Sequence, residues 1–120
     1  MAVFVYKTGS IRVGALTSNI AIEVNTNNDD LGTNSQNILI WNTPNNATKT
    51  LLTSGAQAVA PNNAVLANFS ISAITAFEVE VRYSNPNMVP RVVVTGDVTG
   101  SPLTFAPGTL FHASSETQNP

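Results

Sequence analysis

The sequence predicts an all-β protein, a two-sheet antiparallel sandwich of about eight strands, jelly-roll or immunoglobulin-like. Short apolar segments recur at a spacing of roughly 8–12 residues, separated by turns rich in Asn, Gly, Pro and Ser. The segment 76–83 alternates apolar and charged residues, which gives a strand one apolar and one charged face. No amphipathic segment is long enough for a helix of more than two turns.

The strands expected in chain order are bounded by turn residues. A polar loop is expected over 25–36, and Ser54-Gly55 is expected to end a strand. The segment 57–66 is ambiguous between a turn before a strand and one helical turn. The expected strands are 2–6, 11–13, 20–24, 37–41, 48–53, 68–74, 76–83, 91–95, 103–105 and 109–111. The corresponding organisation is an N-terminal strand or connector arm (1–9), a sandwich domain (10–113) and a polar tail (114–120).

The best-specified part of the chain is 76–97, which we interpret as an antiparallel hairpin with a seven-residue loop over 84–90. Phe77, Val79, Val81 and Tyr83 are expected to face the core. The opposite face carries Glu78, Glu80 and Arg82, and is expected to be solvated or to form cross-strand ion pairs. Arg91 is expected to lie opposite Glu80, because that register pairs opposite charges.

Charge is scarce in this chain. Charged residues make up 10% of the sequence, against about 25% in typical domains. Asn, Thr, Ser and Gln together account for 42 of the 120 residues, so neutral groups supply the polar surface. A net charge of −2 gives no basic footprint for nucleic acid, and no segment has the length of a membrane span. The weak self-repulsion permits close self-association.

No constellation of residues predicts an enzyme, a cofactor or a metal site. Cysteine is absent and His112 is the only histidine, with no nucleophile-elbow sequence for a triad. Glu78 and Glu80 share a face with Arg82, so ion pairing is favoured over glycosidase chemistry. The loop 27–32 is rich in oxygen ligands but lacks the EF-hand spacing, so calcium binding is the weaker interpretation. Trp41 and Tyr83 fall on apolar patterns and are expected in the core, not on a sugar-stacking platform.

The N-terminal strand is apolar on both sides, with Val3 and Val5 on one and Phe4 and Tyr6 on the other. Such a strand either lies inside its own sandwich or pairs with a neighbouring subunit by β-augmentation. The second alternative makes 8–10 a hinge, and predicts that deleting 1–7 leaves a folded monomer that does not polymerise. Unfolding of that truncation assigns the strand to its own core. Residues 103–113, with Leu110 and Phe111, are the next candidate contact.

The order of these features resembles small leaderless β-sandwich spore-surface proteins of Firmicutes, and is similar to endospore appendage subunits, which build pilus-like fibres. The resemblance covers about residues 10–112. It is carried by Ile22-Glu23-Val24, Ile38-Leu39-Ile40-Trp41-Asn42, Ala60-Pro61-Asn62-Asn63, Phe69-Ser70-Ile71, Phe77-Glu78-Val79-Glu80-Val81, Pro90-Arg91-Val92-Val93-Val94-Thr95-Gly96 and Gly100-Ser101-Pro102. It implies a subunit stacked into a filament, with a terminal strand completing the neighbour's sheet. Unlike the better-known appendage fibres, this chain has no N-terminal cysteines, which excludes their covalent cross-links.

We therefore expect a non-enzymatic structural subunit that forms a spore-surface or extracellular fibre by inter-subunit strand augmentation. Its expected partners are copies of itself and other spore-surface proteins, with no nucleic acid or membrane. The N-terminus does not read as a signal peptide, and spore-surface proteins released by lysis of the mother cell need none. The alternatives are a carbohydrate-binding or adhesin-type module, or a virion structural protein.

Overall fold

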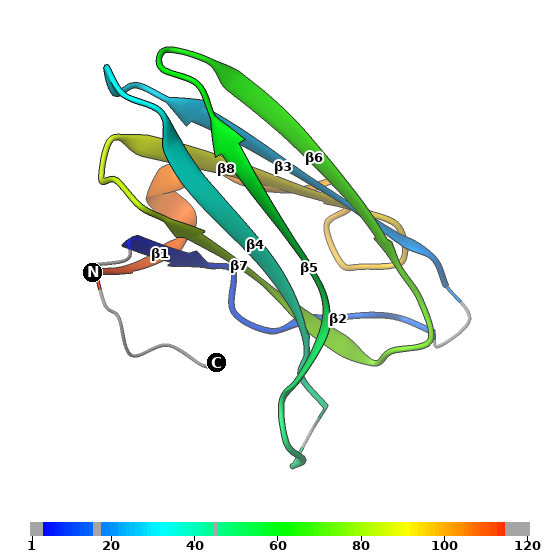
Figure 1. The fold of residues 1–120 in the computed structure, drawn as a ribbon. Helices are drawn as coiled ribbons and strands as arrows, with labels where there is room; N and C mark the ends of the chain where they lie inside the picture. The colour runs from blue at the N-terminus through cyan, green and yellow to red at the C-terminus, as the bar shows by residue number, and fades with distance from the viewer. Residues whose placement is uncertain (1–3, 16–17, 45, 115–120) are drawn as a thin grey trace.

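The computed structural model describes residues 4–15, 18–44 and 46–114, with side chains described as far as residue 111. This part of the chain contains ten strands and one 3-10 turn (Figure 1). The strands are β1 (Phe4–Lys7), β2 (Ile11–Arg12), β3 (Ile20–Asn28), β4 (Asn34–Asn42), β5 (Thr50–Val59), β6 (Ala64–Ile71), β7 (Ala76–Tyr83), β8 (Met88–Thr95), β9 (Leu103–Phe105) and β10 (Phe111–Ser114); the turn is η1 (Pro107–Thr109).

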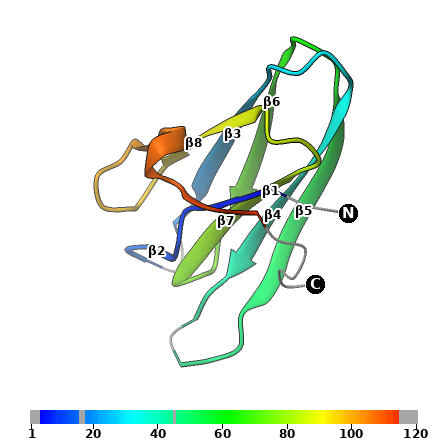
Figure 2. The ribbon, with the colours of Figure 1, turned by 90° about the vertical axis from the view of Figure 1, so that its left-hand side faces the viewer.

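The strands form two antiparallel sheets that pack face to face, as the sequence predicts. Sheet A has six strands in the order β10-β1-β7-β4-β5, with β2 also paired to β7. Sheet B has four, in the order β6-β3-β8-β9. Figure 2 shows β1 (blue) beside the C-terminal strand β10 (red), and the sheet order puts this pair at the opposite end of sheet A from β5. The all-β sandwich is therefore confirmed.

The core lies between the sheets and is built by alternation along the strands. In β3 every second residue is buried, from Ile20 to Asn28. In β7 the residues expected to face the core, Phe77, Val79, Val81 and Tyr83, are all buried. Ile38 and Ile40 of β4 lie opposite Val81 and Val79, so they point to the same side of sheet A.

The expected hairpin over 76–97 is wrong. β7 belongs to sheet A, whereas β8 pairs with β3 and β9 in sheet B. The connection after Tyr83 therefore crosses from one sheet to the other, and the two apolar faces meet across the core. Arg91 lies opposite Asn25 of β3 and is exposed, so it does not pair with Glu80.

Several strands are longer than expected. β3 and β4 extend into the segment expected as a loop over 25–36, and β5 continues through Ser54-Gly55 to Val59. Thr109 ends the 3-10 turn and is not in a strand. The ambiguous segment 57–66 contains the end of β5, a turn and the start of β6. Asn62 has a φ of 54°, a left-handed conformation that Asn tolerates in turns.

Buried polar side chains explain why β3 runs beyond Val24. The Thr26 and Tyr83 hydroxyls are 2.7 Å apart, which joins sheet B to sheet A by a hydrogen bond inside the core. Burial raises the pKa of Tyr83 well above its usual value, so this hydroxyl keeps its proton. The Asn28 side-chain amide donates to the carbonyl oxygens of Gly32 and Val59, 3.0 Å away in each case. β3 can therefore continue through Thr26 and Asn28, because the buried side chain of each has a hydrogen-bond partner.

Candidate functional site

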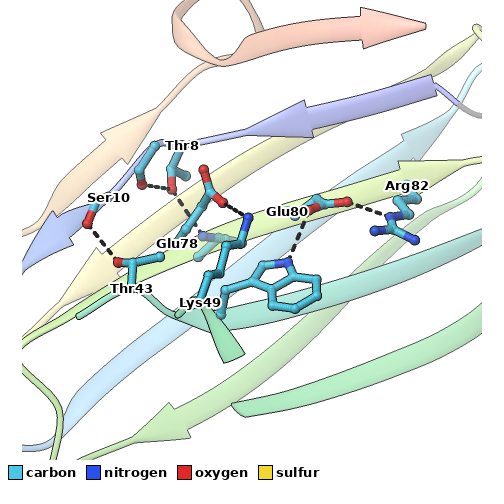
Figure 3. A network of polar contacts seen from close by, with 10 residues as sticks. Thr8, Ser10, Thr43, Lys49, Glu78, Glu80 and Arg82 are labelled. Atoms are coloured by element: carbon cyan, nitrogen blue, oxygen red, sulfur yellow. Dashed lines mark hydrogen bonds and ion pairs between the residues drawn. The ribbon is translucent and has the colours of Figure 1, made fainter. Parts of the chain in front are cut away.

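The outer face of sheet A, which points away from sheet B, carries a network of polar contacts (Figure 3). Glu80 lies at its centre, fully buried, between Lys7 of β1 and Leu39 of β4. The Trp41 indole N–H donates to Glu80 Oε1 at 3.0 Å, and Arg82 Nε–H donates to Oε2. The expectation that this face is solvated is therefore wrong at Glu80, whose two oxygens are both satisfied by protein donors.

A second ion pair lies on the same face. Lys49 Nζ is 2.6 Å from Glu78 Oε1 and lies 4.7 Å from the centre of the Trp41 ring, in a cation–π arrangement. Ion pairing of Glu78 is thus confirmed, although its partner comes from the turn before β5. Each glutamate therefore has a cation beside it, and Glu80 is closed to solvent.

Trp41 and Tyr83, expected to be buried and not to form a sugar-stacking platform, are both buried. Tyr83 lies in the core, where its ring meets that of Tyr6 edge to face at 5.8 Å between centroids. Trp41 is 4% exposed; its indole N–H donates to Glu80, and Lys49 lies over its ring. Neither residue forms an open aromatic platform, in agreement with their assignment to apolar patterns.

The N-terminal strand is paired on both edges within its own chain. β1 lies between β7 and β10, with Val5 opposite Arg82 on one side and Ala113 on the other. Val5 is fully buried, whereas Phe4 and Tyr6 pack against the core. The expected hinge is also held in place, because Thr8 exchanges a backbone and a side-chain hydrogen bond with Val79. Val3 lies outside the described residues.

The C-terminal candidate contacts differ in exposure. Leu110 is buried against the core, whereas Phe111 begins β10 at the edge of sheet A and is 67% exposed. His112 follows in β10, opposite Tyr6, and its side chain is outside the described part. The polar tail after Ser114 is also outside it.

In the loop considered for calcium, both carboxylate oxygens of Asp30 accept hydrogen bonds from amides. Asp30 Oδ2 accepts from the Asn34 side chain at 3.1 Å and from the Gly32 N–H at 3.2 Å. Asp30 Oδ1 accepts from the Asn87 side chain at 3.3 Å. These hydrogen bonds, the one from Asn34 first, lower the pKa of Asp30. The cluster therefore closes the β3–β4 loop, and the described residues contain no group of three or more His, Cys, Asp or Glu side chains that could hold a metal ion.

A hollow of about 350 Å³ is lined by residues of three neighbouring strands, β7, β4 and β5, and by Ser84 after β7. Gln36 lines it, and its side-chain oxygen is buried with no hydrogen-bond partner among the described residues. Its side-chain N–H₂ donates to Gln57 at 3.3 Å. The lining consists of Ser35, Gln36, Asn37, Ala56, Arg82, Tyr83 and Ser84.

A long stretch without charge, 50–77, contains two edge strands that the sequence pattern did not reveal. β5 and β6 are edge strands of the two sheets, and they lie side by side without hydrogen bonding to each other. Between Lys49 and Glu78 the sequence contains no charged residue and no histidine. Leu51, Leu52 and Leu66 are exposed on these strands. The absence of charge could have indicated a long edge strand, but the strand was expected to end at Ser54-Gly55, where β5 in fact continues.

Comparison of the chain with protein-family models, curated proteins and solved structures gives no match. The resemblance to endospore appendage subunits therefore rests on the order of strands and turns in the sequence. Within the residues that the structure describes, no helix is long and apolar enough to cross a membrane.

Proposed function

We propose that this protein is a structural subunit that assembles with copies of itself into a fibre by adding strands at its sheet edges. The observation that carries the proposal is the long, charge-free edge at β5. Natural sheets protect such edges with charged residues, proline, bulges or very short strands. β5 has ten residues with no charge and no proline, and its edge away from β4 is unpaired in the described chain; its one irregularity is a register shift against β4 at Leu52, near its start.

A polymer also needs a second contact on each subunit, because a single two-fold contact closes into a dimer. β10 is the other outer strand of sheet A, and Phe111 is exposed there. Contacts at β5 and β10 would extend sheet A in both directions. Phe111 thus remains a proposed inter-subunit residue.

Donation of β1 is a different route to the same fibre. It requires β1 to leave β7 and β10, and Val5 to leave a fully buried position. We therefore place augmentation at the free edges and expect deletion of Met1 to Lys7 to lower stability or unfold the chain. Circular dichroism and light scattering check this. A folded truncation that stays monomeric would instead support donation by β1.

We place the fibre at the spore surface or outside the cell, with copies of the chain as its main partner and other spore-surface proteins as further ones. The support is the neutral polar composition and the resemblance in strand order. The low charge also offers no surface for nucleic acid. Negative-stain microscopy of the purified protein tests assembly. Fibres support the proposal, closed particles favour a virion protein, and monomers at all concentrations contradict both.

The hollow at Gln36 favours a second candidate function, binding of a neutral polar molecule such as a sugar. A buried oxygen without a partner is one hydrogen bond short, and a ligand hydroxyl would supply it. Glycan binding that is lost in Gln36→Leu and kept in Leu52→Lys would support this function over assembly.

A further inference from the structure

We draw no further inference here: the strongest candidate, the unpaired outer edge of β5 with the exposed side chains of Leu51 and Leu52, carries none, because nothing in the structure shows what covers it.

Discussion

Removal of the Glu80 carboxylate is expected to destabilise the fold although Glu80 lies on the outer face of sheet A. Glu80→Ala leaves the Trp41 N–H without its acceptor in a site where Trp41 is 4% exposed. An unpaired buried donor costs about 1–3 kcal/mol, and loss of the bond to Arg82 adds about 1 kcal/mol. The contribution of the Arg82 bond is kept at this low value because the Arg82 side chain is 19% exposed, so water can hydrogen-bond to its guanidinium when the carboxylate is removed. The expected loss is about 2–4 kcal/mol, or roughly 8–20 °C in melting temperature.

Urea denaturation followed by fluorescence measures this loss directly, because Trp41 is the only tryptophan. Glu80→Gln keeps the size of the side chain and an oxygen for the indole, so it is expected to cost about half as much. Glu23→Ala is the matched control, since Glu23 is exposed on β3, and it is expected to stay within about 0.5 kcal/mol. Equal stability of Glu80→Ala and Glu23→Ala would refute the reasoning.

Four further predictions follow from the same structure. Val79→Asp is expected to cost more than about 4 kcal/mol, because it puts an unpaired charge into the core, and circular dichroism should show an unfolded chain. Glu78→Lys is expected to cost about 1 kcal/mol through loss of the ion pair with Lys49, and the double change with Lys49→Glu should recover part of it in urea denaturation; no recovery would mean that the pair contributes nothing. Tyr83→Phe leaves the buried Thr26 hydroxyl without a partner and is expected to cost about 1–2 kcal/mol, with Tyr6→Phe as a comparison at a less buried ring. The lowered pKa of Asp30 means that its stabilising contribution is present at neutral pH and is lost as pH falls below about 4, so Asp30→Asn should flatten the acid side of a plot of melting temperature against pH; an unchanged acid side would contradict this.

The sequence alone determined which face of each well-patterned strand is buried. Alternation over 76–83 placed Phe77 and Tyr83 in the core, and both are buried there. This works because the side chains of a strand point alternately to its two faces, whatever strand lies beside it. The all-β class followed for the same reason. Alternation, however, carries no information about which strands are neighbours in a sheet.

Only the tertiary structure decided the strand partners and the fate of the polar residues. A hairpin and a connection between sheets bury the same faces, so β7 and β8 could not be assigned to different sheets from their pattern. From the pattern, Glu80 was expected to face solvent, but it is buried and accepts a hydrogen bond from Trp41. Thr26 was expected in a loop, but it is buried and hydrogen-bonds to Tyr83. Both partners are distant in sequence. Only the fold shows that the charge-free stretch over 50–77 contains two edge strands, β5 at the end of sheet A and β6 at the end of sheet B.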